Sequence, residues 1–293
     1  MTLRRTLATL AAALGAAASL AAVPPTDDPW AWTLDGEDCS LIPPLPAAVL
    51  DSMPIVTGPC PGVRPGARVV IGSGGCTMNF LFEGWRIVED KKVFAGHYIG
   101  TAGHCVFPED ADNVEQTWSA SSGPVARDAA GNRIGSVVYA ILKDPKDFAL
   151  IRLDKGVEAS PQMCHWGGPL SLNRDIVKQP VTLRQSGQGD IYGSTVPGRT
   201  HYAGSMVSSD HVYATGPALY GDSGSPVISQ DGRAVGVLVS GGAHTSVRTD
   251  AIDSGIVAIT RLGPQADRAQ SKLGLIELNL RTAPLANDDD GAS

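Results

Sequence analysis

The chain of 293 residues has no apolar run after residue 22 that is long enough to cross a membrane as a helix. It also lacks an excess of positive charge, because 23 lysines and arginines stand against 30 aspartates and glutamates, for a net charge of −7. A nucleic-acid-binding protein needs a basic face. These absences argue against a membrane-embedded mature protein and against a partner nucleic acid, and they fit a soluble exported protein.

Metal-binding patterns and internal repeats are also missing. The six histidines show no repeated metal-ligand spacing, and no segment of the chain repeats another. We therefore expect no metal site and no organic cofactor. Five of the histidines are interpreted as surface or structural residues: His97, His165, His201, His211 and His244.

The N-terminal segment has the pattern of a secretory signal peptide. Arg4 and Arg5 supply the positive region, and Leu7 to Ala22 form an uninterrupted apolar run with small residues suited to cleavage. We expect residues 1–22 to be a signal peptide and the mature protein to be secreted. An uncleaved anchor is the alternative.

A proline-rich stretch follows the apolar run. Residues 24–65 contain ten of the 21 prolines and no lasting apolar period. Such composition is typical of an extended segment that does not fold alone. Residues 23–66 are therefore predicted to be an N-terminal arm or pro-segment.

A serine enclosed by flexible residues lies in the stretch Tyr220–Pro226, which leads into an apolar strand. Gly221 and Gly224 give the backbone freedom on both sides of Ser223. A nucleophilic serine needs such exposure, together with a base. The backbone N–H groups of Gly221 and Ser223 lie two residues apart, so a tight turn can aim both at one oxyanion.

Two other segments supply a base and a carboxylate. His104 can accept the proton of the Ser223 hydroxyl, because imidazole titrates near neutrality. Asp147 can orient the imidazole, since it directly precedes an apolar run and would be carried to the start of a buried strand. Asp144 competes with it, but lies in a charged turn before a proline, where aspartate is expected for local reasons.

The order His104, Asp147, Ser223, with separations of 43 and 76 residues, resembles the chymotrypsin-like (trypsin-like, S1) serine protease family. The matching motifs are Thr-Ala-Gly-His-Cys, Asp-Phe-Ala-Leu-Ile-Arg-Leu and Gly-Asp-Ser-Gly-Ser-Pro. The resemblance extends from Val69 to Leu275. It implies an all-β fold of two packed six-stranded antiparallel barrels, with the three residues in the cleft between them and a C-terminal helix.

Two details of the serine motif bear on this resemblance. Ser225 stands where many members of the family carry glycine, but serine is also small and compatible with the turn. In α/β-hydrolases the nucleophile lies in G-x-S-x-G and precedes the acid and the histidine. Here the residue two after Ser223 is not glycine, and His104 comes first, so that fold is excluded.

The resemblance also indicates a substrate pocket. Its base would lie at Pro217, and its wall would be formed by the strand that ends at Ser240, followed by Gly241 and Gly242. No acidic residue occurs at positions 216–220, which disfavours a preference for Arg or Lys. We expect a small or medium apolar side chain of the substrate to be bound there.

Five cysteines in an exported chain predict disulfide bonds with one cysteine left over. The family pairs Cys76 with Cys105, which would tie the histidine loop to a strand. A cysteine at the position of Cys164 can tether an N-terminal segment in the family. Its partner is then Cys60, which we favour, or Cys39; a Cys39–Cys60 pair with Cys164 free is the rival.

From residue 67 to 280 the chain is expected to form the protease domain, and residues 281–293 a disordered acidic tail. Leu262, Ala266, Ala269 and Leu273 follow a helical spacing. Strands are expected at 68–71, 76–82, 93–102, 134–142, 148–153, 180–185, 204–208, 212–214, 226–229 and 234–240.

The expected function is that of a secreted, monomeric serine endopeptidase that acts on peptide or protein substrates. Peptide bonds would be hydrolysed through an acyl-enzyme formed on Ser223. Two alternatives stay open: a zymogen that needs removal of the N-terminal arm, and a catalytically silent secreted binding protein of the same fold.

Overall fold

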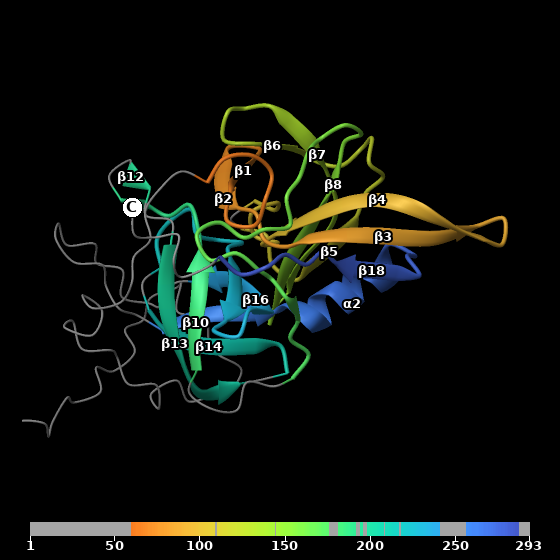
Figure 1. Ribbon diagram of the computed structural model, residues 1–293. Helices are drawn as coiled ribbons and strands as arrows, with labels where there is room; N and C mark the ends of the chain where they lie inside the picture. Colours follow the sequence, from red (N-terminus) through yellow and green to blue (C-terminus); the bar gives the residue numbers. More distant parts are fainter. Residues whose placement is uncertain are drawn as a thin grey trace, which may run out of the picture. The chain divides into compact units, whose positions relative to one another are not determined.

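A computed structural model describes residues 60–108, 110–143, 145–175, 181–191, 194–195, 198–207, 209–216, 218–240 and 256–286. The first sheet has the order β18-β3-β4-β8-β7-β6-β1-β2, with β5 also paired to β7 (Figure 1). Its strands are β1 (Arg68–Ile71), β2 (Gly74–Thr77), β3 (Leu81–Val88), β4 (Lys91–Thr101), β5 (Val114–Thr117), β6 (Val125–Arg127), β7 (Arg133–Lys143), β8 (Lys146–Leu153) and β18 (Glu277–Leu280).

The second sheet closes on itself. Its order is β15-β10-β13-β14-β17-β16-β9, and β15 also pairs with β16, so that six antiparallel strands form a ring to which β9 adds in parallel. The strands are β9 (Ser171–Leu172), β10 (Val181–Ser186), β13 (Gly198–Val207), β14 (His211–Thr215), β15 (Pro226–Ser229), β16 (Arg233–Ser240) and β17 (Ile256–Arg261); β11 (Asp190–Ile191) and β12 (Ser194–Thr195) pair separately.

The predicted all-β class is confirmed, with one α-helix, α2 (Leu262–Lys272), among the described residues near the C-terminus. The expectation of six strands per barrel matches the closed ring of the second sheet. The first sheet has nine strands, and no pairing among its described residues closes it. The extra strands arise because short edge segments and β18 join it.

Strand β7 shows why some segments do not alternate between polar and apolar residues. Residues 134–142 are buried without interruption. Val137 and Ala140 pack in the interior of the first sheet with Val69, while Tyr139 and Ile141 belong to a cluster on its other face. Because both faces of the strand are covered, its buried residues are apolar or glycine at every position except Ser136.

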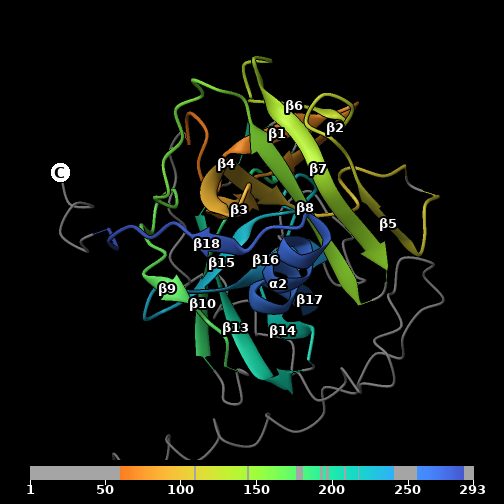
Figure 2. The same ribbon diagram turned by 90° about the vertical axis from the view of Figure 1, so that its right-hand side faces the viewer.

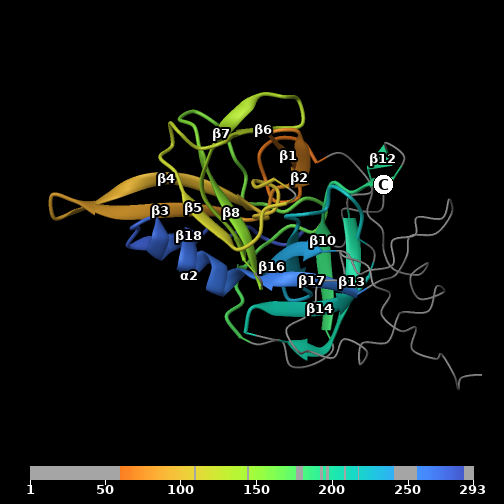
Figure 3. The ribbon, with the colours of Figure 1, turned by 180° about the vertical axis from the view of Figure 1, so that it is seen from behind.

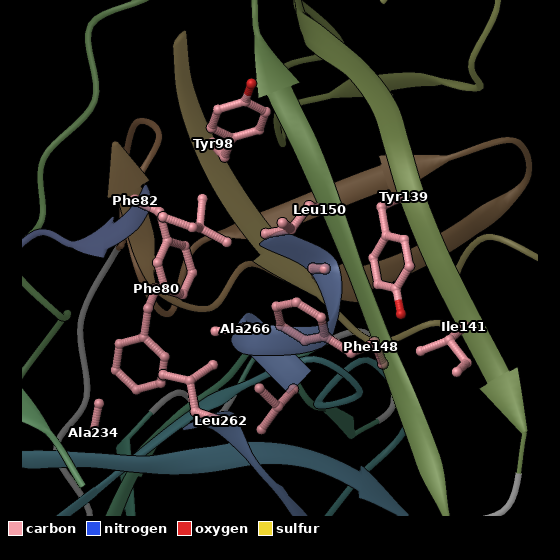
Figure 4. Close-up of a cluster of buried hydrophobic side chains, with 14 of the residues drawn as sticks. Phe80, Phe82, Tyr98, Tyr139, Ile141, Phe148, Leu150, Ala234, Leu262 and Ala266 are labelled. Atoms are coloured by element: carbon pink, nitrogen blue, oxygen red, sulfur yellow. The ribbon is translucent and has the colours of Figure 1, made fainter. Parts of the chain in front are cut away.

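The largest hydrophobic cluster joins the two sheets and α2. Phe80, Phe148 and Leu150 come from the first sheet and its connections, and Leu262 and Ala266 come from the helix (Figure 4). The second sheet contributes Ile228, Ala234, Val237 and Ala258. Figure 2 shows α2 beside β16 and β17, and it also contacts β7 and β8. Burial of this shared apolar surface holds the sheets together.

A carboxylate fastens the helix to the first sheet. Glu115 on β5 accepts two hydrogen bonds from Arg268 on α2, at 2.8 and 2.6 Å, and one from the hydroxyl of Tyr139 at 3.1 Å. Burial alone would raise the pKa of Glu115, but these donors outweigh it and lower the pKa. Burial of Tyr139 itself, together with the neighbouring carboxylate of Glu115, raises the pKa of the tyrosine hydroxyl.

The described fold includes residues on both sides of the predicted domain range of 67–280. Residues 281–286 were expected to be disordered, yet Ala283 N donates to Pro169 O and Ala286 N donates to Trp166 O. Strand β18 lies along β3 (Figure 3). At the other end, residues 60–66 pack on the domain, with Val63 buried and Gly66 N donating to Met78 O. Backbone pairing extends the folded domain beyond 67–280 in both directions.

We expect the last strand to be essential for stability and the residues after 286 to be dispensable. Deletion of residues 276–293 removes the β18–β3 pairing and the buried Leu278, and should lower the free energy of unfolding by more than about 3 kcal/mol, since loss of one buried leucine side chain alone costs about 2–5 kcal/mol. Deletion of residues 287–293 is the control. Denaturant unfolding of both variants checks this, and equal stabilities would contradict it.

Candidate active site

His104 and Asp147 form a close pair. His104 follows β4, and Asp147 is the second residue of β8. The Nδ1 atom of His104 lies 2.6 Å from Oδ2 of Asp147, and the backbone N–H of His104 donates to Oδ1 at 3.0 Å. Both carboxylate oxygens therefore hold the same residue. With Nδ1 hydrogen-bonded in this way, Nε2 is the ring nitrogen that can accept a proton.

The environment of His104 shifts its pKa. Burial disfavours the imidazolium form, but the charge of Asp147 and the hydrogen bond to it outweigh burial and raise the pKa of His104 above its usual value of 6.5. The Asp147 side chain is only 5 % exposed, against 30 % for His104. The Asp147 carboxylate, which solvent hardly reaches, thus stabilises the imidazolium form of His104, whose ring solvent still reaches.

The turn that carries Ser223 is attached to the first sheet by Thr77, at the end of β2. The Thr77 N–H donates to Ser223 O at 2.8 Å, and the Thr77 hydroxyl donates to Gly221 O at 2.7 Å. On the opposite side, Gly224 N donates to Leu238 O on β16 at 2.8 Å. The serine turn is therefore fixed between the two sheets.

The Cys76–Cys105 disulfide brings the serine turn and His104 to one place. The sulfur of Cys105 lies 3.9 Å from Ser223 O, and a ring nitrogen of His104 is within 4.8 Å of both sulfurs. These atoms do not make a metal site, because both cysteines are bonded to each other in the disulfide and offer no thiolate.

Gly224, the residue after Ser223, packs closely against the first sheet. A Cβ on Gly224 would lie 2.4 Å from Thr101 Oγ1, so only glycine allows this close approach.

The hydroxyl of Ser223 forms no hydrogen bond with any residue that the structure describes, so the expected bond to Nε2 of His104 is not made. In free enzymes such bonds are often long and tighten only when substrate binds. The N–H groups of Gly221 and Ser223 likewise have no partner among the described residues. Two donors close to a serine hydroxyl are suited to bind a developing oxyanion.

Asp222 supports the turn from below. Its side chain is fully buried, and Oδ2 accepts a hydrogen bond from Leu219 N at 2.8 Å. Tyr220, by contrast, is 86 % exposed. The chain thus passes from an exposed residue to a fully buried one between Tyr220 and Asp222, and Ser223, the next residue, is half-buried.

Several of the predicted residues cannot be placed. Pro217, Gly241, Gly242, Asp144 and Cys39 lie outside the described residues. Ser240 is the last residue of β16 and pairs through its backbone with Ala258. The substrate pocket therefore stays a prediction.

Two disulfides are present among the described residues. Cys60 is bonded to Cys164, and Cys76 to Cys105. The first closes a separation of 104 residues and attaches the segment that leads in from the N-terminal arm. The second closes 29 residues, for which a chain-entropy model gives about 3–4 kcal/mol.

Sequence reasoning missed Thr77 and Gln188. The Gln188 backbone N–H donates to Thr77 Oγ1 at 2.9 Å, and its side-chain amide donates to Gly66 O at 2.8 Å. Thr77 follows Cys76, but a threonine in a strand carries no signal of its own. Its partners lie 111 and 144 residues away in the sequence, so only the fold discloses them.

Gly221 offers a direct test of how tightly the turn is built. Its φ is +94°, and a Cβ there would lie 2.4 Å from Gln188 O. The backbone strain of an alanine at this positive φ costs about 1–2 kcal/mol. Gly221→Ala should lower the free energy of unfolding by more than this, because of the contact with Gln188 O. Gly131→Ala is the matched control, since Gly131 has φ +85° and nothing within 4 Å of its Cβ position. Equal losses in denaturant unfolding would show that the contact with Gln188 does not constrain the turn.

A comparison with protein families identifies the family of the chain. The family model of the trypsin-like peptidase domain matches residues 84–237, more than half of the chain and a range that includes His104, Asp147 and Ser223. No curated protein matches the chain. Nothing in the part of the chain that the structure describes is a helix long and apolar enough to span a membrane.

Three of the solved structures that are similar to the chain are proteases of low sequence identity. One is a glutamic-acid-specific serine protease (16 % identity, 75 % of this chain and 100 % of that chain covered, TM-score 0.49). Others are Thermobifida fusca protease A (17 %, 75 % and 98 %, 0.48) and Cellulomonas bogoriensis chymotrypsin (18 %, 75 % and 98 %, 0.48). On the match of the family model, the chain belongs to the trypsin-like peptidase family and is a serine-type peptidase.

Proposed function

We propose that the protein is a secreted serine endopeptidase in which Ser223, His104 and Asp147 form the catalytic triad. The observation that carries this proposal is the 2.6 Å His104–Asp147 pair, held beside a serine turn whose Gly221 and Ser223 N–H groups have no partner among the residues that the structure describes. Each of the three residues has the chemistry that its role requires: a hydroxyl, a base that titrates near neutrality and a buried orienting carboxylate.

In the proposed reaction, Ser223 Oγ attacks the carbonyl carbon of the scissile peptide bond while His104 Nε2 takes the hydroxyl proton. The N–H groups of Gly221 and Ser223 donate to the oxyanion. The imidazolium of His104 then gives its proton to the leaving amine as the C–N bond breaks, which leaves an acyl-enzyme on Ser223. Water, deprotonated by His104, releases the acid and regenerates the serine.

Secretion is supported by the N-terminal apolar run, proposed here as a signal peptide of residues 1–22, and by the two disulfides. Residues 23–59 would then be the arm that leads to Cys60. We further propose that the protein acts as a monomer, and that the pocket at Pro217, Ser240, Gly241 and Gly242 accepts a small or medium apolar side chain.

A zymogen or a silent binding protein is the second candidate. The observation that favours it is the absence of a hydrogen bond between Ser223 Oγ and His104 among the described residues. An active enzyme needs that bond during attack. The two candidates are separated by the reactivity of Ser223 before and after removal of the arm.

A fluorophosphonate probe tests the nucleophile. The full-length secreted protein should be labelled on Ser223, and Ser223→Ala should lose the label. Ser121→Ala is the control, because Ser121 is an exposed serine on a surface turn. Labelling that persists in Ser223→Ala would overturn the assignment. Labelling that begins only after limited proteolysis of the arm would indicate a zymogen, and none under either condition a binding protein.

The raised pKa of His104 predicts the pH dependence of that reaction. Only neutral imidazole accepts the proton, so the labelling rate should rise with pH through a midpoint above 6.5, the usual histidine value. Asp147→Asn removes the charge that holds the proton on His104. The midpoint should then fall, and the maximal rate should drop by about 10⁴-fold because the tautomer is no longer fixed. An unchanged midpoint and rate would exclude Asp147 as the triad carboxylate.

A further inference from the structure

Three consecutive peptide groups surround Ser223, and their orientations decide where its N–H points. In a trans peptide the carbonyl oxygen and the N–H point in opposite directions, so a bond that fixes one also aims the other. The groups join Gly221 to Asp222, Asp222 to Ser223 and Ser223 to Gly224.

The outer two peptide groups are held at both ends. In the first, Gly221 O accepts from the Thr77 hydroxyl, and Asp222 N donates to Leu219 O at 3.0 Å. In the third, Ser223 O accepts from Thr77 N, and Gly224 N donates to Leu238 O. Thr77 thus holds both outer carbonyls.

The middle peptide group is held only at its carbonyl. Asp222 O accepts two hydrogen bonds from Ser225, one from the backbone N–H at 2.8 Å and one from the side-chain hydroxyl. The N–H of Ser223 lies at the other end of this peptide and has no partner among the described residues. The carbonyl is turned inward, and the N–H is therefore aimed outward, away from Ser225.

We propose that Ser225 and Thr77 are positioning residues, which hold the Ser223 N–H in the direction that stabilises the oxyanion. This inference rests on the proposed triad. Ser225 stands where many members of the family carry glycine, which has no hydroxyl to offer. Its side chain is fully buried, and a buried hydroxyl is costly unless it is hydrogen-bonded. The additional bond to Asp222 O satisfies that hydroxyl and restrains the peptide at once.

The size of the effect follows from what each change removes. Direct loss of an oxyanion donor costs about 10²–10³-fold in rate. Removal of the Ser225 hydroxyl keeps the donor and leaves one of the two bonds to Asp222 O, so a smaller loss of about 10-fold is expected. It should lower the maximal rate of phosphonylation, in which the phosphoryl oxygen occupies the oxyanion position, rather than the binding of the probe.

The first test compares Ser225→Ala with Ser229→Ala. Ser229, the last residue of β15, is buried like Ser225. Its hydroxyl, however, forms hydrogen bonds with Asp231 and Arg233 at a turn outside the site. The concentration dependence of labelling by a fluorophosphonate gives the maximal rate and the half-saturating concentration. Ser225→Ala should lower the maximal rate about 10-fold with the half-saturating concentration and the pH midpoint unchanged. Ser229→Ala should leave all three values at those of the unmodified protein.

Thr77 supplies the second test. Thr77→Val keeps the shape and removes the hydroxyl, whereas Thr77→Ser keeps the hydroxyl and loses a methyl group. Thr77→Val should slow labelling and Thr77→Ser should restore it. Denaturant unfolding of every variant shows whether the chain is folded under the labelling conditions, and the rates are compared for folded protein.

The outcomes distinguish this inference from the proposed function. If the unmodified protein labels on Ser223 but Ser225→Ala labels at the same rate, the positioning role is wrong and the triad stands. A loss in Ser225→Ala that Ser229→Ala shares, or a shifted pH midpoint, also overturns it, because general destabilisation or a disturbed His104 would then explain the rate. If the unmodified, arm-trimmed protein does not label at all, both proposals fail.

Discussion

The hydrogen bonds from Thr77 to the serine turn are the contact on which the arrangement of the site depends. Asp147 lies on a strand of the first sheet and His104 follows another strand of it, whereas Ser223 lies in a turn that leads into the second sheet. Without a bond across the boundary, the base and the nucleophile would be placed only by side-chain packing. Thr77 supplies two such bonds from one residue, its N–H to Ser223 O and its hydroxyl to Gly221 O. The adjacent Cys76–Cys105 disulfide fixes the position of Thr77 relative to the histidine loop.

The C-terminal segment secures the same boundary from the other side. Helix α2 begins directly after β17 of the second sheet, contacts strands of both sheets, and is followed by β18 in the first sheet. The chain then returns to Trp166 and Pro169, before the second sheet. Burial of Leu262, Ala266 and Ala269 stabilises this crossing only when both sheets are in place. The position of each sheet relative to the other thus depends on the packing of α2 against both of them.

The sequence predicts the parts of this molecule that are encoded locally. The His104, Asp147 and Ser223 motifs are recognisable because each needs a particular short stretch, and the strands β1 and β15 have the bounds expected from their apolar runs and turns. Thr77, Gln188 and β18 were not foreseen, because what defines them is a partner more than 100 residues away or, for Glu277–Leu280, an exposed edge of β3 that exists only in the fold. Residues 281–286 likewise form backbone hydrogen bonds with Leu81, Pro169 and Trp166, distant partners that the local sequence does not reveal.

The unmade bond between Ser223 and His104 acquires a limited meaning from the state of the turn. Gly221 already has a positive φ of +94°, and the carbonyls of Gly221, Asp222 and Ser223 are all hydrogen-bonded inward. The backbone of the turn is thus already held by hydrogen bonds on the side away from the Ser223 N–H, and the proposed attack would need no change of these backbone contacts. A zymogen in the stricter sense would have to rebuild the turn itself. The described turn has these backbone contacts in a chain in which Cys60 is bonded to Cys164, so a zymogen of this kind would have to break them.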